Sequence, residues 1–332
     1  MTLLILTTDD SSAGCLEASR IADHVTAIEY RLVTGPVPFV AEPVAFFSRR
    51  AELGGSKIAR WDQDGPGSRL SRCWLELIDV CKRFEDIEIW PNPEPNSQLQ
   101  LVQLLGWLRS CPDIVQKLTL VSPDFRIGHC KPEEIASLRP HPRKISDAQF
   151  DIANLALRAF QQPTPEACFR LTRERTLDHL PHLRRALSQL LEELPDRDTA
   201  LTSSETELLN IISKEPIVPM RLMGEYIGNN PLSVLDYWEL GEALHRLAHC
   251  HAPTILGLTE GSFTLELHDD RDRFERYQRS KLSLSELGQA LLEKQADFSR
   301  QNKIDRWWGG TRLTNDRLWR WDAKANGLIS PT

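Results

Sequence analysis

The first 122 residues of the chain alternate between short strand-like runs and segments in which apolar side chains recur at helical spacing. The strand candidates are bounded by turn-forming residues and lie at 3–8, 26–33, 87–90 and 117–122. The first of them is a continuous apolar run, which is typical of a strand that is buried on both faces. Strands that alternate with helices pack as a parallel sheet covered by helices. We therefore expect a Rossmann-like α/β domain over residues 1–145.

The turn after the first expected strand contains Asp9, Asp10 and Ser11 and lacks the Gly-x-Gly-x-x-Gly fingerprint of a standard dinucleotide site. Open α/β sheets bind ligands at the carboxyl ends of their strands, so Asp10 and Ser11 lie where a ligand crevice is expected. A carboxylate there can accept hydrogen bonds from a ribose or an amine, or help to hold Mg²⁺, whereas it repels a bare phosphate. The alternative is that Asp10 and Ser11 only cap the following helix.

A second group of polar residues follows the expected strand over 87–90. Glu94 lies in a loop that prolines at 91, 93 and 95 make extended and stiff, and Gln98 comes just after it. We expect these side chains to form one pocket with the first turn and with the Gly-Pro-Val-Pro loop that begins at Gly35. Gln98 has an alternative role, in which it caps the next helix or ties the loop down. The expected ligand-binding residues are Asp10, Ser11, Gly35, Glu94 and Gln98.

From residue 146 onward the sequence predicts one helix after another. Ser146 with Gln149, and Thr202 with Glu205, have the spacing of capping boxes at helix starts. Helices are expected over 150–160, 177–194, 208–212, 220–227, 233–249 and 284–292, and β-like pieces over 254–259 and 262–267. Three helices, a hairpin and a closing helix are the order of a winged helix-turn-helix. We therefore expect a winged-helix-like domain over residues 146–300.

The expected recognition helix of that domain is a poor match to DNA. It runs over 233–249 and carries Asp236, Glu239 and Glu242 against Arg246. Because phosphate contacts dominate affinity for DNA, a net acidic helix reads a duplex badly. The net charge of the whole chain, −7, points the same way. A protein partner is therefore a better expectation than DNA.

Histidines at 245, 249 and 251 surround Cys250 at the end of the same helix, and a metal site is one interpretation. No carboxylate or thiol pair completes a ligand set nearby, and histidine is also favoured at a helix C-terminus by the helix dipole. We therefore expect no metal there. The seven cysteines are scattered and the chain has neither a signal-peptide start nor an apolar run of membrane length, which predicts a cytoplasmic protein without a membrane span.

The last segment, residues 301–332, is rich in tryptophan and arginine. A hairpin is expected there, with strands over 311–313 and 317–322 and a turn at Asn315 and Asp316. The spacing places Trp319 and Trp321 on one face, and we expect both to be buried so that the segment clasps the rest of the chain. The alternative is an aromatic and basic platform for single-stranded nucleic acid. The clasp residues are Arg306, Trp307, Gly309, Gly310, Trp319, Arg320, Trp321 and Asp322.

Several of these motifs together resemble a known family. They are the turn at 8–11, the loop at 35–38, the stretch from Trp90 to Leu101, and the terminal Arg-Trp-Trp-Gly-Gly and Leu-Trp-Arg-Trp-Asp sequences at 306–310 and 318–322. The chain is in these respects similar to the bacterial proteins that carry domain of unknown function 1835. The resemblance implies a Rossmann-like domain with a helical C-terminal half and implies no established activity. This chain departs from the family pattern at Asn92 and Glu94, where the family tends to have Glu and Asp. It also departs at Thr34, where the family has an acidic residue.

Two functions fit these expectations. The first is a non-enzymatic regulatory or interaction protein, whose N-terminal domain senses a small nucleotide-like ligand and whose winged helix meets a protein or nucleic-acid partner. The second is an enzyme on a nucleotide or nucleic acid, with Asp10 as metal ligand or base and with Glu94 and Gln98 positioning the substrate. The absence of a Ser/His/Asp order, of zinc spacing and of a Walker or Rossmann glycine loop favours the first. No cofactor and no catalytic residue is assigned.

Overall fold

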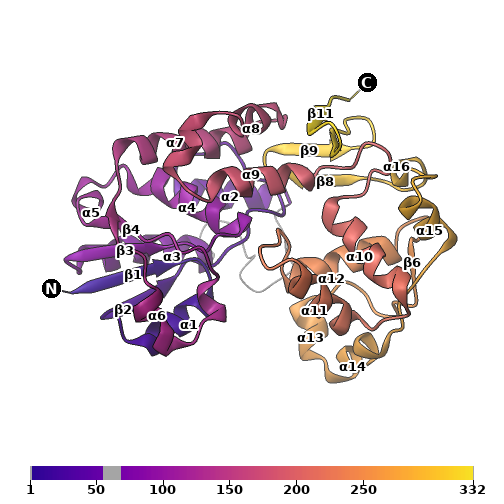
Figure 1. Ribbon diagram of the computed structural model, residues 1–332, viewed down its shortest axis with the longest axis horizontal. Coiled ribbons are helices and arrows are strands. Elements are labelled where there is room, and N and C mark those ends of the chain that lie inside the picture. The colour runs from indigo at the N-terminus through magenta and orange to yellow at the C-terminus, as the bar shows by residue number, and fades with distance from the viewer. Residues whose placement is uncertain (1, 55–68, 332) are drawn as a thin grey trace.

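The computed structural model describes residues 2–54 and 69–331, and a five-stranded sheet forms the centre of its N-terminal lobe (Figure 1). The strand order is β2-β1-β3-β4-β5, with β5 antiparallel to β4 and the other neighbours parallel. The strands are β1 (Leu3–Thr7), β2 (His24–Ala27), β3 (Asp86–Trp90), β4 (Leu118–Leu120) and β5 (Arg143–Lys144). Strands alternate with helices along this lobe, so the expected α/β class and its largely parallel sheet are confirmed.

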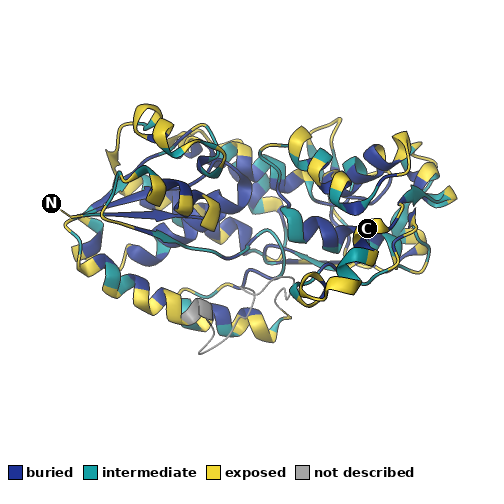
Figure 2. Ribbon diagram, turned by 90° about the horizontal axis from the view of Figure 1, so that it is seen from below, coloured by how far each residue is buried: buried dark blue, intermediate teal, exposed yellow. Residues whose placement is uncertain are grey.

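Helices cover both faces of the sheet, and Figure 2 shows buried strands at its centre, where β1 and β3 lie. Leu4 and Leu6 of β1 belong to one apolar cluster and Ile5 to another, which shows that alternate side chains of this strand enter opposite layers. One layer contains α1 (Asp10–Ser19) and α6 (Pro132–Leu138), and the other contains α3 (Arg69–Lys82) and α4 (Pro95–Leu108). Burial on both faces is the reason that the first strand is continuously apolar.

The order of the strands reverses beside β1. The chain leaves β1 through α1 to reach β2 on one side, then returns past α2 (Pro43–Glu52) and α3 to β3 on the other side. The carboxyl ends of β1 and β3 therefore adjoin while their following segments diverge, which opens a crevice at this edge. The turn after β1 and the loop after β3 both lie at this crevice.

Three helices after the sheet pack on the N-terminal lobe. They are α7 (Asp147–Phe160), α8 (Glu166–Leu171) and α9 (Leu183–Glu192), and α4 contacts both α7 and α9. The capping box of Ser146 and Gln149 is present, as expected. The expected helix over 177–194 is instead a 3-10 turn (Arg175–His179) followed by α9, because Pro181 cannot continue a helix. The chain thus becomes helical at residue 147, but it leaves the first lobe only after α9.

The C-terminal lobe is built on α10 (Ser203–Lys214), α11 (Pro219–Asn229), α12 (Tyr237–Ala248) and α15 (Glu286–Leu292). The Thr202 and Glu205 capping box is present as expected. The helix expected from residue 233 begins later, at a capping box formed by Asp236 and Glu239. The helix expected from 284 also begins later, at Glu286, with Ser285 as its N-cap.

The expected hairpin of residues 254–259 with 262–267 is wrong. β6 (Ile255–Leu256) pairs with β7 (Ser283–Leu284), and the segment between them forms α13 (Leu265–Asp269) and α14 (Arg271–Arg279). Apolar alternation at Phe263 and Leu267 imitates a strand, but the Thr264 side chain accepts a hydrogen bond from the Leu267 amide and caps a helix. Next to this pair, Leu282 forms an antiparallel bridge with Ile217.

The terminal segment also pairs differently from the expected hairpin. β8 (Asp305–Trp308) pairs with β9 (Thr311–Thr314), and β10 (Arg320–Asp322) pairs with β11 (Gly327–Ile329). A single bridge, Thr314 to Arg317, lies at the expected Asn-Asp turn. Asn315 instead accepts a hydrogen bond from the Ile304 amide and donates to the carbonyl oxygens of Ser299 and Asn302, so it anchors the start of the hairpin.

The turn between β8 and β9 consists of Gly309 and Gly310 and presses on the end of α7. Gly309 has a φ of +56°, and a Cβ on it would lie 2.3 Å from the carbonyl oxygen of Phe160. A Cβ on Gly310 would lie 2.0 Å from the carbonyl oxygen of Gln161. Only glycine fits at both positions, so the pair sets the hairpin turn and its docking surface together.

All seven cysteines are free thiols, in agreement with their scattered spacing. Within residues 2–54 and 69–331, no helix has the length and the apolar character that crossing a membrane requires.

Candidate functional site

A cavity of about 330 Å³ opens where the carboxyl ends of β1 and β3 meet the C-terminal lobe. We call it the interlobe cleft. The turn after β1 and the loop after β3 form one wall, and the segment that leads into α12 forms the other. The side chains that matter most to its chemistry are Asp10, Glu94 and Arg126 from the first lobe, and Ser233, Asp236 and Trp238 from the second.

The turn after β1 places Asp10 and Ser11 in the cleft, exposed at the start of α1. Neither of them caps the helix. Asp9 does so: its carboxylate accepts hydrogen bonds from the amide and the hydroxyl of Ser12, both at 2.8 Å. Because a carboxylate already occupies the N-terminus of α1, this end of the helix does not offer an anion site.

Glu94 stands at the N-cap position of α4, but its side chain makes no capping hydrogen bond. It is 8% exposed and lines the cleft, and its Oε2 atom has no hydrogen-bond partner among the residues that the structure describes. Burial raises the pKa of this carboxyl, and the nearby charge of Asp9 adds to the rise while Arg126 opposes it. A buried acceptor without a partner is rare in proteins, so this atom is suited to a donor from a ligand.

Gln98 lies beneath the cleft, outside its lining. Its Nε2 donates to the carbonyl oxygen of Asn92 at 2.7 Å, so it ties down the proline-rich loop, which was its alternative role. Asn92 in turn donates to Asp9 at 2.6 Å and to Ser12, and accepts from the amide of Ile127. Asn92 was not among the predicted site residues, although its position two residues after a strand was a usable signal.

Gly35 is also outside this cleft. It has a φ of +72° and lines a second cavity, of about 480 Å³, together with Arg306 and Trp307. We call this second space the hairpin cavity. The expected single pocket is therefore divided: Asp10, Ser11 and Glu94 come together, whereas Gly35 does not join them.

Arg31 holds the two walls of the cleft together, and it is not among the residues that the sequence predicts for the site. Its guanidinium donates to both carboxylate oxygens of Glu239, at 3.0 and 2.6 Å, and to the carbonyl oxygen of Val234. Burial alone would lower the pKa of Arg31, but the carboxylates of Asp236 and Glu239 hold it above the ordinary value. A partner 208 residues away leaves no local signal in the sequence.

The charge of the cleft favours a ligand that is rich in hydrogen-bond donors. Five carboxylates line it, and of its two arginines Arg31 is already paired with Asp236 and Glu239. The guanidinium of Arg126 has no hydrogen-bond or ion-pair partner within the described part of the chain, so it is available to an acceptor group. Burial and the charge of Arg126 lower the pKa of His129, which therefore presents a neutral imidazole at pH 7. The five carboxylates are those of Asp9, Asp10, Glu29, Glu94 and Asp236.

The expected clasp residues are held by many contacts with the rest of the chain. Trp319 and Trp321 are buried, as the sequence predicts, and the backbone of Trp321 exchanges hydrogen bonds with residues 195 and 197. Arg320 reaches the carboxylate of Asp297 at 2.8 Å, and Asp322 accepts from Arg197 at 2.7 Å. The aromatic side chains of this segment therefore serve mainly to stabilise the fold.

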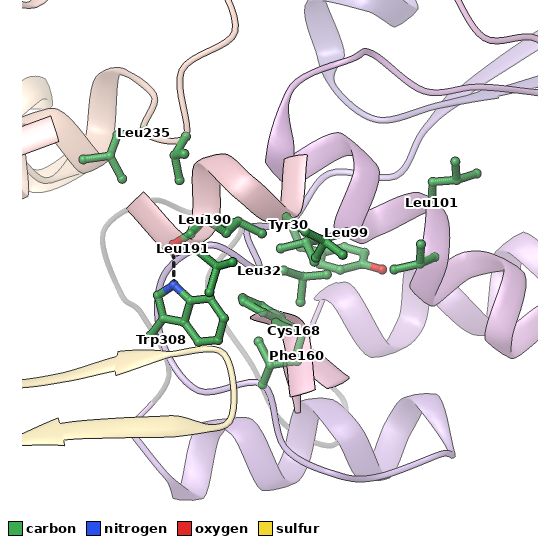
Figure 3. Close-up of a cluster of buried hydrophobic side chains, with 14 of the residues drawn as sticks. Tyr30, Leu32, Leu99, Leu101, Phe160, Cys168, Leu190, Leu191, Leu235 and Trp308 are labelled. Carbon is green, nitrogen blue, oxygen red and sulfur yellow. Dashed lines mark hydrogen bonds between the residues drawn. The ribbon is translucent and has the colours of Figure 1, made fainter. Parts of the chain in front are cut away.

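The hairpin β8–β9 is attached to both lobes. Trp308 lies against Leu190 and Leu191 in Figure 3, and its indole nitrogen donates to the Leu190 carbonyl oxygen at 2.6 Å. Gly309 accepts from the amide of Val37, and Arg306 donates to Glu205 of α10. The loop that begins at Gly35 is thus a docking site for the hairpin.

The histidines at the end of α12 do not form a ligand set. The rings of His245 and His249 are 4.7 Å apart, and His249 bonds the carbonyl oxygen of Glu260. In the described ranges, no group of three histidine, cysteine, aspartate or glutamate side chains is placed to hold a metal ion.

No family model matches the chain, and no curated protein sequence matches it.

Proposed function

We propose that this chain is a non-enzymatic regulatory protein that binds a small nucleotide-like ligand in the interlobe cleft and presents its C-terminal lobe to a protein partner. One observation carries the proposal. The Oε2 atom of Glu94 is buried in a cleft at the reversal of strand order and has no partner among the described residues. Ligands of open α/β sheets bind at this position.

The chemistry of the lining defines the ligand class. Glu94 and Asp10 accept hydrogen bonds from hydroxyl or amino groups, Arg126 donates to an acceptor group, and the aromatic side chain of Trp238 adds apolar surface to the lining. A nucleoside or a nucleoside monophosphate supplies all three features. Because Asp9 occupies the N-terminus of α1, the phosphate of such a ligand belongs beside Arg126 and away from that turn.

The C-terminal lobe supports a winged-helix interpretation in its order of elements. Three helices, α10 to α12, are followed by two strands that pair, and Ile217 before α11 adds a bridge to the second of these strands. This is the element order of a winged helix, with α13 and α14 in place of the wing.

A protein partner suits this lobe better than DNA. The helix that would enter a DNA groove, α12, begins in the interlobe cleft and is fixed to the first lobe by Arg31. Its first turn is acidic, with Glu239 buried against that arginine. A helix start that is occupied in this way cannot contact base edges, which are read mainly by the N-terminal residues of a recognition helix.

The ligand proposal is tested by thermal shift with adenosine, guanosine, cytidine, uridine and their 5′-monophosphates. A ligand at about 100 times its Kd stabilises the native state by about 2.7 kcal/mol, which raises the Tm by several degrees. Glu94→Gln is expected to weaken binding at least tenfold, whereas Glu134→Gln, an exposed carboxylate on α6, leaves binding unchanged. The proposal fails if none of the eight compounds shifts the Tm, or if Glu94→Gln binds as well as the wild-type chain.

An enzyme remains the second candidate, and one observation favours it. Burial raises the pKa of Glu94, as a general base at neutral pH requires. Gln98, however, is tied to Asn92 and does not reach the cleft, so the expected substrate-positioning group is missing. Chromatography of the same compounds after incubation separates the two functions: a product that disappears in Glu94→Gln indicates an enzyme.

We also propose that the chain is a divergent member of the domain of unknown function 1835 family. This proposal is supported by the positions of the motifs that resemble the family, because they contact one another in the fold. The turn at 8–11 and the loop after Trp90 form one wall of the interlobe cleft, and the Gly-Pro-Val loop at 35–37 receives the terminal Gly-Gly turn. Motifs that are far apart in the sequence are thus paired in space.

A further inference from the structure

The hairpin cavity is distinct from the interlobe cleft and has a different chemistry. Its volume is about 480 Å³, within the range of small-molecule sites. Its walls come from the loop 33–35, the end of α9, α12 and the strand β8. Figure 3 shows three of its apolar lining residues, Leu190, Leu235 and Trp308.

Arg306 on β8 brings an incompletely bonded guanidinium to this cavity. Its Nη1 donates to Oε1 of Glu205 at 3.0 Å. The Nε and Nη2 atoms are buried, and neither has a hydrogen-bond partner in residues 2–54 and 69–331. These two nitrogens form one edge of the planar group, where two parallel N–H donors match the two oxygens of a carboxylate or a phosphate.

The neighbouring carboxylate cannot satisfy this edge. Oε1 of Glu205 is shared by Arg306 and Arg246, both at 3.0 Å, and its Oε2 accepts from the amide of Thr202. Burial raises the pKa of Glu205, but the two arginines outweigh burial and bring it to about 2. One negative charge therefore faces two positive charges at this point.

Two of the acidic side chains that line the cavity are already bonded elsewhere. Asp305 is held by a two-point ion pair with Arg312 and lies near Lys303. Glu193 accepts two hydrogen bonds from Ser204. Glu242 also lines the cavity. A ligand that brings its own oxygens is thus the natural partner for the open edge of the guanidinium, since a buried charged donor without a partner is costly.

We propose that the hairpin cavity binds a small metabolite through its carboxylate or phosphate group, with the Nε–Nη2 edge of Arg306 as the anchor. The inference does not depend on the ligand of the interlobe cleft. Because the cavity is bounded by both lobes and by β8, an anion bound there strengthens the attachment of the hairpin to the rest of the chain.

The test uses the full chain in a chloride buffer at constant ionic strength. Inorganic phosphate and succinate are the two probes, and calorimetric titration gives the affinity for each. Arg306→Lys keeps the charge but removes the two-donor edge, and Arg312→Lys makes the same exchange on the adjacent strand, where the side chain is exposed. We expect one of the probes to bind the wild-type chain and Arg312→Lys equally, and to bind Arg306→Lys at least tenfold more weakly.

The probe that binds identifies the chemical class of the ligand. Binding of phosphate without succinate assigns a phosphate ligand, and the reverse assigns a carboxylate. Absence of binding by both probes overturns the proposal, as does equal binding to Arg306→Lys. Circular dichroism of both variants shows whether they fold. If Arg306→Lys is unfolded, crystals of the wild-type chain grown with each probe decide instead: density for an anion on the Arg306 edge supports the site, and an ordered water or an adventitious ion only overturns it.

Discussion

Arg31 and Glu239 form a two-point ion pair across the lobes, with the guanidinium on the segment after β2 and the carboxylate in the first turn of α12. Glu239 is 3% exposed, also accepts from the hydroxyl of Thr34, and bonds the amide of Asp236 in the capping box of its own helix. One buried carboxylate thus joins the N-terminal lobe to the start of α12. The position of the cleft wall that leads into α12 depends on this ion pair.

Removal of one partner of this pair is expected to be costly. Arg31→Ala leaves the carboxylate of Glu239 buried and short of donors, and we expect the free energy of unfolding to fall by about 3–5 kcal/mol. Arg109→Ala breaks an exposed ion pair with Asp151 and is expected to cost at most about 1 kcal/mol. Urea unfolding of both variants measures the difference. Equal losses would show that the Arg31 pair is no more important than a surface contact.

The glycine turn of the hairpin gives a second prediction. In Gly310→Ala the new Cβ would meet the carbonyl oxygen of Gln161 at 2.0 Å, so the hairpin must move away from α7. We expect a loss of about 3 kcal/mol or more, at the upper end of overpacking effects. Gly224→Ala, in the middle of α11 with no atom within 4 Å of the new Cβ, is expected to stabilise the chain by about 0.5–1 kcal/mol. Thermal unfolding that ranks the two variants in the opposite order would contradict this account.

Features of the fold that rest on local chemistry could be predicted from the sequence. The run at 3–8 and the capping boxes at Ser146 and Thr202 are each defined within a few residues, and each is present. Pairing of distant segments could not be predicted in this way. The terminal hairpin turns at Gly309 because that turn fits against α7, and no property of residues 311–322 alone reveals this contact.

The same division applies to the site. Asp10 and Glu94 were found because the carboxyl end of a parallel strand is a position that sequence defines. Arg31 and Trp238 belong to the site only because the second lobe packs over the first, and they are more than 200 residues apart. Gln98 was misplaced because a residue one turn into a helix can face the crevice or the loop beneath it, and its hydrogen bond to Asn92 decides the matter.

Asn92 gives a third prediction. Its amide donates to the carboxylate of Asp9 at 2.6 Å, so Asn92→Asp sets two carboxylates side by side and loses two donated hydrogen bonds. We expect a loss of about 2–3 kcal/mol at pH 7 that shrinks in acid, because one proton shared by the two acids relieves their repulsion. Asn154→Asp adds the same charge beside Arg158 on α7 and is expected to have little effect. Urea titrations at pH 7 and in acid compare the variants. A loss that does not depend on pH would show that repulsion between the two carboxylates is not its cause.

The last prediction concerns the dependence of stability on pH. Burial raises the pKa of Glu193 from 4.5 to about 7 in the folded chain, despite hydrogen bonds from Ser204 that oppose the rise. Between those two values the folded state holds a proton that the unfolded state has released, so stability falls as the pH rises through this window. The shift corresponds to a loss of up to about 3 kcal/mol. Glu205 acts in the opposite direction: its pKa of about 2 means that its contribution is complete above 4.5 and is lost in stronger acid.

These two carboxyls together predict a stability maximum close to the ordinary pKa of glutamate, on the acid side of neutrality. In Glu193→Gln the decline from pH 4.5 to pH 7 should become shallower, because the side chain no longer titrates. The exposed Glu293→Gln on the end of α15 serves as the control and should keep the wild-type slope. Chemical unfolding across this range supplies the measurement. If Glu193→Gln and the wild-type chain lose stability in parallel, another buried group is responsible for the decline, and Glu193 is ionised in the folded chain.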